Sequence, residues 1–277
     1  MIINRETGTW AVYGGMLLGG GGGGDIQEGL RILDLALSYA QEIPLRPLSE
    51  IDPQAIILTA SLVGSPASKE RYVAPAHYQR VYQIFRQQYP GEIGGIITNE
   101  MGAQSSTNGW VLAAMTGLPL IDAPCNGRAH PTGVMGALGL AEEKGYRSIQ
   151  VGVGGREHRE TEIYVSGDLG TASSLIRSAA SAAGGFVTVL RNPVTADYVA
   201  KHAAVGALSH SIKVGQVLYR ELGNADAVVE ALANTLGVQE ICRGVISDHD
   251  LNITEGFDLG TLTIETDGLP VDNLFLE

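Results

Sequence analysis

The chain has 277 residues, of which 44% are hydrophobic and 17% charged, and its formal net charge is -12. This composition is typical of a globular protein and excludes a largely disordered chain. The negative charge and the lack of any Lys/Arg run argue against nucleic acid or an anionic membrane surface as partners. We therefore expect a small-molecule substrate.

Cysteine usage and the N-terminal residues indicate the compartment. The two cysteines, Cys125 and Cys242, cannot build a disulfide framework, and the first ten residues lack the basic and apolar regions of a signal peptide. No apolar run reaches the roughly 18 residues that a membrane-spanning helix needs. We expect a cytoplasmic protein, and we expect it to form a homo-oligomer.

Hydrophobic periodicity predicts alternating helices and strands in the first half of the chain. The predicted helices cover residues 26–40, 78–89 and 106–115, and the predicted strands cover residues 55–60, 93–98, 119–121 and 148–153. Thr132 stands where an N-cap belongs, so we predict a further helix over the following residues VMGALGLAEEKG.

The second half begins with the same alternation and ends in short β runs. We predict a strand at EIYVS, a helix over residues 171–183, a strand over 186–190 and helical structure from 194 to 236. The fold class is therefore α/β, with mixed sheet and flanking helices over residues 1–236. A β-rich segment over residues 237–277 follows, and its ~40 residues look too few to fold alone.

The glycine run Gly19–Gly24 contains the pattern GxGxxG and precedes a predicted helix. A dinucleotide-binding fold also needs an acidic residue at the end of its second strand, where this chain has Thr59, Ala60 and Ser61. A nucleotide-dependent oxidoreductase is thus a weak hypothesis.

The same glycine run also has two simpler interpretations. Backbone N–H groups of Gly21, Gly22 and Gly23, at the start of a helix, can hold an anionic group of a substrate. Alternatively, Asp25 is the helix N-cap and Glu28 completes a capping box. We favour capping for Asp25 and ligand approach for the glycines, because six ordered glycines are costly.

Two polar stretches carry candidate metal ligands. Asn99 and Glu100 follow the predicted strand 93–98, at the sheet edge where ligands bind in this fold class. Glu100 is a general base, a metal ligand or a solvated loop acid. In REHRETE, extended geometry would align His158, Glu160 and Glu162 for a hard metal ion, although an exposed charged hairpin is the favoured interpretation.

Residues 122–133, DAPCNGRAHPTG, place four reactive side chains on one strand-to-helix loop. Arg128 and the helix expected at Thr132 would lower the pKa of Cys125 and make it a nucleophile, with His130 as base and acid and Asp122 orienting His130. The contacts to substrate in this loop would come from Asn126 and Arg128.

A structural turn is the alternative for the same loop. Cys125 is then a small buried apolar side chain, and Asp122 accepts backbone N–H groups and pairs with Arg128. For Cys125 the sequence supports the catalytic and the structural interpretation equally. For Asp122 and Arg128 it favours the functional interpretation.

Five stretches resemble the S-methyl-thiohydantoin desulfurase family, which is related to hydantoinases. They are LLGGGGGGD (17–25), SLVGSP (61–66), EIGGIITNE (92–100), GLPLIDAPCNGRAHP (117–131) and, more loosely, VGALSHSIKVGQVL (205–218). The resemblance implies an α/β domain followed by a β-rich domain. It also implies hydrolysis of a small five-membered cyclic amide or thioamide.

The chain departs from the family pattern at two places. Pro124 stands where family members carry a second acidic residue, and His130 replaces an aromatic residue before the proline. One carboxylate that could bind a divalent metal is thus missing, and metal dependence stays open. The chain also ends at Glu277, before a further β domain of the family, so we expect a shortened C-terminal domain.

These observations support two main hypotheses. The first is a hydrolase of a hydantoin-like ring, in which Cys125 or a water attacks the ring carbon and Glu100 or His130 moves protons. The second is a non-catalytic subunit that binds a small molecule or a protein partner, suggested by the missing acidic residue and the expected shortening.

Overall fold

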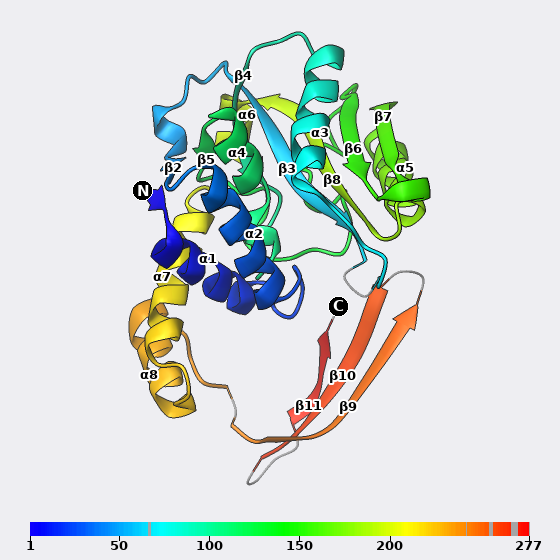
Figure 1. The fold of residues 1–277 in the computed structure, drawn as a ribbon. Coiled ribbons are helices and arrows are strands. Elements are labelled where there is room, and N and C mark those ends of the chain that lie inside the picture. The colour runs from blue at the N-terminus through cyan, green and yellow to red at the C-terminus, as the bar shows by residue number, and fades with distance from the viewer. Residues whose placement is uncertain (66–67, 242, 255–256, 267–270, 277) are drawn as a thin grey trace. The chain divides into compact units, whose positions relative to one another are not determined.

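A computed structural model describes residues 1–65, 68–241, 243–254, 257–266 and 271–276. The chain divides into two compact units, Met1–Gln216 and Val217–Glu277 (Figure 1). Cys242 lies outside the described residues. The predicted α/β class with a mixed sheet is confirmed.

The first unit is built on one eight-stranded sheet in the order β1-β2-β5-β4-β3-β8-β6-β7. Strands β2, β5, β4 and β3 run parallel, whereas β8, β6 and β7 pair antiparallel. The strands are β1 (Ile2–Ile3), β2 (Ile43–Arg46), β3 (Ile56–Gly64), β4 (Ile93–Thr98), β5 (Leu120–Ile121), β6 (Ser148–Gly154), β7 (Thr161–Gly167) and β8 (Phe186–Thr195). The sheet is therefore mixed, with its parallel half on the β2 side.

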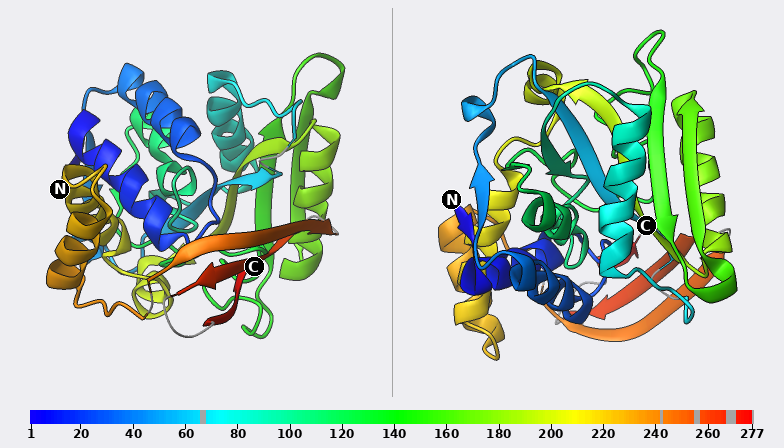
Figure 2. Two further views of the ribbon diagram at one scale, coloured as in Figure 1. Left: turned by 90° about the horizontal axis from the view of Figure 1, so that it is seen from below. Right: turned by 45° about the horizontal axis from the view of Figure 1, so that its top comes forward.

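Helices cover both faces of this sheet (Figure 2). They are α1 (Arg5–Leu18), α2 (Ile26–Tyr39), α3 (Pro75–Gln88), α4 (Trp110–Thr116), α5 (Leu169–Ala182), α6 (Ala196–His202) and α7 (Ala207–Arg220), with short 3-10 turns η1 (Leu48–Glu50), η2 (Ser105–Thr107) and η3 (Glu157–Arg159). Phe85 of α3 packs in one core cluster with Leu190, and Ile176 of α5 packs in another with Val189. Since neighbouring residues of a strand point to opposite faces, α3 and α5 cover opposite sides of β8.

The helix expected from Thr132 does not form. Residues 131–145 make a series of turns, in which Leu138 and Gly139 both have positive φ, at 56° and 71°. Gly133, Gly136 and Gly139 interrupt the stretch, and each glycine disfavours a helix interior by about 1 kcal/mol relative to alanine. The apolar spacing in this stretch was thus misleading.

The glycine run lies between two helices. The apolar residues before it belong to α1, which Asn4 caps by accepting the N–H groups of Glu6 and Thr7, both at 3.0 Å. A dinucleotide-binding fingerprint needs a strand at this place, so the oxidoreductase hypothesis has no structural support.

The second unit contains α8 (Ala225–Leu236) and an antiparallel sheet in the order β11-β10-β9. Its strands are β9 (Val245–Thr254), β10 (Phe257–Glu265) and β11 (Val271–Leu276). The Asn224 side chain caps α8 by accepting the N–H of Ala227 at 3.1 Å, and Gly237 ends the helix with φ 66°. The predicted runs GVIS and LNIT join into the single strand β9.

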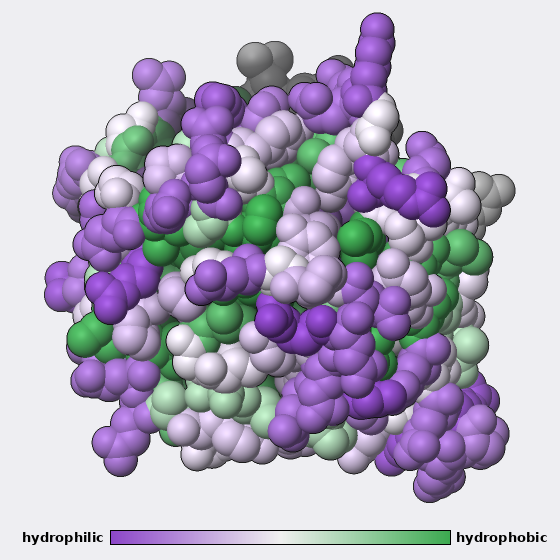
Figure 3. All heavy atoms as spheres, turned by 90° about the horizontal axis from the view of Figure 1, so that it is seen from above, coloured by the Kyte–Doolittle hydropathy of each residue, from purple (hydrophilic) through white to green (hydrophobic). Residues whose placement is uncertain are grey.

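The surface drawn in Figure 3 is largely hydrophilic, and its apolar side chains lie in groups between hydrophilic ones. Over the described part of the chain, none of the helices is both long and apolar enough to span a bilayer.

Candidate functional site

The glycine run, the loop after β4 and the loop after β5 meet in the first unit. The carbonyl of Gly23 accepts the N–H of Gln104 at 2.9 Å, and a Cβ at Gly23 (φ +80°) would lie 2.6 Å from the Cα of Gly102. A Cβ at Gly22 would lie 2.8 Å from the Cβ of Ala129. The glycines therefore permit a backbone approach that brings the three sequence motifs together.

The amides of the glycine run have different surroundings. The N–H of Gly22 donates to the carbonyl of Gly19 at 3.1 Å, so the turn itself uses it. A Cβ at Gly21 would meet nothing within 4 Å, which shows that this end of the loop borders open space. Of the three glycines proposed to approach a ligand, Gly21 is thus the most accessible.

The N-terminus of α2 is occupied by its own cap. Asp25 Oδ1 accepts the N–H of Glu28 at 2.8 Å, which confirms the predicted N-cap. The Glu28 carboxylate pairs with Arg31 at 2.6 Å instead of returning to Asp25, so the predicted capping box is wrong.

Glu100 and His130 form a buried pair beneath these loops. Glu100 Oε2 accepts the backbone N–H of His130 at 3.2 Å and lies 3.0 Å from His130 Nε2. On the other side of the ring, Nδ1 lies 2.8 Å from the carbonyl of Thr132. A carbonyl only accepts, so Nδ1 carries the ring hydrogen and Nε2 of a neutral ring is bare.

This tautomer places two acceptor atoms in contact. Nε2 is buried without a well-directed hydrogen bond, and only a proton between it and the Glu100 oxygen would make the contact favourable. A Cβ at Gly136 would lie 1.9 Å from Nε2, so the ring is pressed against the Gly136 backbone. The pair is therefore held rigidly by its surroundings.

The proton of this pair resides on Glu100. Burial raises the pKa of Glu100 to about 7, against the opposing effects of the His130 N–H, Ser105 and Arg191. Burial and, after it, the positive charge of Arg191 lower the pKa of His130 to about 4, against the opposing effect of the Thr132 and Asn99 backbone. Near neutral pH the carboxyl can gain or lose a proton while the imidazole stays neutral, which suits general acid–base chemistry.

Cys125 is buried and protonated at neutral pH. Its Sγ lies 3.3 Å from Thr59 Oγ1, and burial raises its pKa to about 11 despite that hydrogen bond. No helix begins at Thr132, and Arg128 is exposed, with its Nε donating to a backbone carbonyl at 3.1 Å. The expectation that these two features lower the pKa of Cys125 is therefore wrong.

Asp122 caps α7. Its Oδ1 accepts the N–H groups of Leu208 at 3.0 Å and Ser209 at 3.2 Å, which agrees with the first part of the structural alternative. The ion pair with Arg128 that this alternative also expected is not formed among the described residues. His130 contacts Glu100 and Thr132 instead of Asp122.

The remaining candidates line the loops near this pair. Asn99 is buried, and its Oδ1 accepts the Nδ2 hydrogen of Asn108 at 2.7 Å. Asn126 is half-buried and Arg128 exposed in the loop after β5, and Arg128 forms no ion pair within the described ranges. Asn126 and Arg128 are thus partly or fully accessible to solvent.

Arg191 is a buried residue that the sequence patterns did not single out. It is 2% exposed on β8, opposite Thr59 of β3, and its Nε has no hydrogen-bond partner in the part of the chain that the structure describes. The predicted strand stopped at Leu190, whereas β8 continues to Thr195, past a register irregularity at which Asn192 has φ 56°. Extending the alternation of Val187 and Val189 by two residues would have placed Arg191 on the same face.

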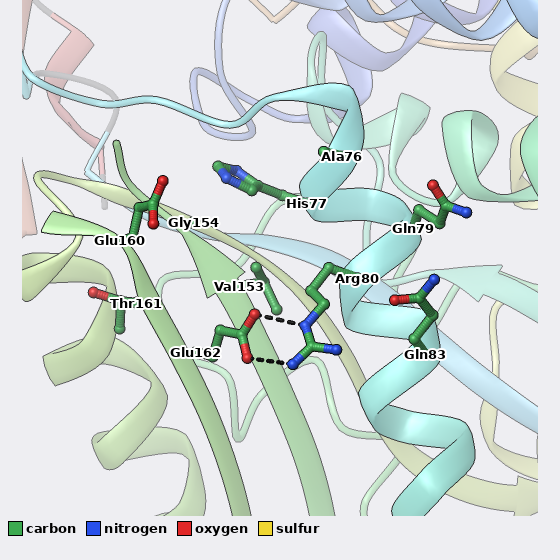
Figure 4. A pocket seen from close by; sticks show the side chains of 10 residues that line it. All are labelled: Ala76, His77, Gln79, Arg80, Gln83, Val153, Gly154, Glu160, Thr161 and Glu162. Carbon is green, nitrogen blue, oxygen red and sulfur yellow. Dashed lines mark hydrogen bonds and ion pairs between the residues drawn. The ribbon is translucent and has the colours of Figure 1, made fainter. Parts of the chain in front are cut away.

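A surface pocket of about 400 Å³ lies elsewhere, between α3 and strands β6 and β7 (Figure 4). Arg80 crosses it and donates to both oxygens of Glu162, at 2.6 and 2.8 Å. Glu160 also lines it, but His158 does not. Among the residues that the structure describes, no three His, Cys, Asp or Glu side chains converge as metal ligands.

Comparison with solved structures supports the fold. An X-ray structure of a protein from Chromobacterium violaceum matches with a TM-score of 0.68 at 15% sequence identity, covering 99% of this chain and 77% of that one. At this identity the likeness concerns the fold alone. No curated protein matches the chain.

Comparison with protein families is more specific. The S-Me-THD-like N-terminal domain matches residues 9–156, and the S-Me-THD-like C-terminal domain matches residues 168–272. The expectation of a shortened C-terminal domain is therefore wrong, because this domain is present. Since the two matches span most of the sequence, the chain belongs to the S-Me-THD-like family.

Proposed function

We propose that the protein is a hydrolase of a small hydantoin-like or thiohydantoin-like cyclic amide. The observation that carries this proposal is the Glu100–His130 pair, a buried carboxyl with a pKa of about 7 against a neutral imidazole of defined tautomer. Family membership supports the substrate class.

In the proposed reaction a water molecule is the nucleophile. The Glu100 carboxylate takes a proton from this water as its oxygen adds to the ring carbon. The C–N or C–S bond then breaks, and the proton on Glu100 passes to the leaving nitrogen or sulfur. His130 Nε2 stabilises the protonated form of Glu100 between the two steps, because its lone pair faces the same carboxyl oxygen.

The other loop residues have supporting roles in this proposal. Cys125 is a buried side chain that stays protonated, because its pKa is about 11. In this proposal it forms no covalent bond to the substrate. Asn126, Arg128 and the backbone at Gly21 contact the substrate on the side of the solvent.

A divalent metal finds few donors at this place. Glu100 and His130 supply two, while Asp122 is engaged by α7. The proposed reaction therefore uses no metal ion.

The proposed setting is the cytoplasm, which the low cysteine content supports. A homo-oligomer remains part of the proposal, and sedimentation velocity tests it.

Turnover of hydantoin, 2-thiohydantoin and S-methyl-thiohydantoin, measured by mass spectrometry of the products, tests the proposal. Glu100→Gln should lower kcat at least ~100-fold, the scale of one general acid–base group. Cys125→Ser should stay within a few-fold of the unsubstituted protein, and the exposed Glu142→Gln is the matched control.

Binding without turnover of any ring would favour the second candidate, a non-catalytic binding or assembly subunit. That candidate is supported by the use of Asp122 as a helix cap and by Pro124 at the position of the family's second acid. A loss of turnover in Cys125→Ser with an unchanged rate in Glu100→Gln would refute the proposed roles of both residues.

A further inference from the structure

Arg191 is a buried cation on strand β8. Its side chain is 2% exposed, its Nε has no hydrogen-bond partner, and it forms no ion pair among the residues described. A guanidinium stays charged in proteins, and burying an unpaired charge costs free energy. A ligand that supplied a negative charge at this place would offset that cost.

Other unpaired polar atoms lie on the strands beside Arg191. Among the residues that the structure describes, Ser61 Oγ of β3 and Asn192 Nδ2 of β8 are buried donors without a partner, and Gln150 Oε1 of β6 is a buried acceptor without one. Gln150 lies opposite Arg191 in the register of β6 and β8, and its Nε2 donates to Ser148 Oγ at 3.0 Å. The unpaired donors on these two adjacent strands are therefore Ser61 Oγ, Asn192 Nδ2 and the cationic Arg191 Nε. Such donors can hydrogen-bond to an anion.

A glycine makes room for the tip of the guanidinium. A Cβ at Gly133 would lie 2.8 Å from Arg191 Nη1 and 3.3 Å from Ser173 Oγ. A side chain at position 133 would therefore press on the guanidinium.

Arg191 also acts electrostatically on the proton-transfer pair. Its charge lowers the pKa of both Glu100 and His130, while Glu100 and Cys125 are the groups that favour the charged form of Arg191. A negative group held by Arg191 would thus lie within electrostatic range of the carboxyl that moves protons.

We propose that Arg191 binds the negatively charged group of the substrate, and that the protein selects anionic ring compounds over neutral ones. The negative group is either a carboxylate carried on the ring or the ionised imide or thioimide of the ring itself. This inference rests on the proposed function for the reaction, but its binding step can be tested separately.

Calorimetric titration with three probes distinguishes these possibilities: hydantoin-5-acetate, its neutral amide, and 2-thiohydantoin. The protein should bind an anionic probe at least ~10-fold more tightly than the neutral amide, as expected for a charge-assisted hydrogen bond. Preference for hydantoin-5-acetate identifies a carboxylate, and preference for ionised 2-thiohydantoin identifies the ring anion. Equal binding of all three would overturn the proposal.

Arg191→Met should lose this preference and leave binding of the neutral amide unchanged, while Arg191→Lys should keep part of it. Arg177→Met, on the exposed side of α5, is the control. Because Arg191 has no ion partner among the described residues, Arg191→Met should melt at the same or a higher temperature. A large fall in melting temperature that lysine restores would show a structural cation and refute the inference.

The two proposals fail separately. Arg191-dependent anion binding without turnover refutes the hydrolase and leaves this inference standing. Turnover of anionic rings that is unaffected in Arg191→Met refutes this inference alone.

Discussion

Replacing Glu100 by glutamine should make the protein more stable at alkaline pH, although it removes the proposed proton carrier. In the folded chain burial raises the pKa of this carboxyl from 4.5 to about 7. At 1.36 kcal/mol per pH unit, this difference corresponds to a cost of about 3 kcal/mol once the carboxyl is ionised in the folded state. Glutamine carries no charge and avoids that cost.

The sign follows from the number of bound protons. Below pH 4.5 the carboxyl is protonated in both states, so stability is highest there with respect to this group. Between pH 4.5 and about 7 the unfolded chain loses the proton and the folded chain keeps it, so the free energy of unfolding falls as pH rises. The gain of Glu100→Gln should thus be under about 1 kcal/mol at pH 5 and about 3 kcal/mol at pH 8.

His130 acts in the opposite direction over nearly the same range. Its pKa is lowered from 6.5 to about 4, so the unfolded chain binds the extra proton in this window and stability falls as pH falls. The two effects offset each other in the unsubstituted protein. In Glu100→Gln only the His130 effect remains. The free energy of unfolding of this variant should therefore rise by about 3 kcal/mol between pH 4 and pH 6.5.

Urea denaturation at pH 5 and pH 8, followed by tryptophan fluorescence, measures these differences. Both tryptophans, Trp10 and the fully buried Trp110, lie in the unit Met1–Gln216 that contains Glu100. The midpoint for Glu100→Gln at pH 8 should exceed that of the unsubstituted protein by about 1 M or more. An equal gain at both pH values, or a lower stability at pH 8, would refute the reasoning. The control Glu142→Gln should leave the midpoint unchanged at both pH values.

Three further predictions concern the groups around this pair. Iodoacetamide should modify Cys125 at pH 8 at least ~100-fold more slowly in the folded than in the urea-unfolded protein, because the thiol is buried with a pKa of about 11; comparable rates by mass spectrometry would contradict this. Asp122→Ala should lower the free energy of unfolding by about 1–2 kcal/mol through the lost α7 cap, with Asp122→Asn recovering most of it in urea denaturation. Gly136→Ala should displace His130 and lower kcat at least ~10-fold with little loss of helical circular dichroism, and an unchanged kcat would show that the ring position is unimportant.

Local patterns were sufficient where a segment's neighbours in sequence decide its conformation. Strand 93–98 and helix 26–40 were located almost residue by residue, because each shows one clean period and ends at a clear turn or cap signal. The helix predicted after Thr132 was wrong because two local signals conflict there. The apolar spacing is helical, whereas the glycines disfavour a helix. Strand β8 was ended too early because a bulge at Asn192 looks like a turn in sequence.

By itself the sequence determined the α/β class, the family resemblance and the position of Glu100 and His130 on loops that follow two neighbouring strands. These properties depend on hydrophobic periodicity and on residues close together in the chain. Only the tertiary structure decided that Asp122 serves α7, that Cys125 keeps its proton, and that Arg191 lies buried without an ion partner among the described residues. Burial and contact arise between distant segments, so periodicity along the chain carries no record of them.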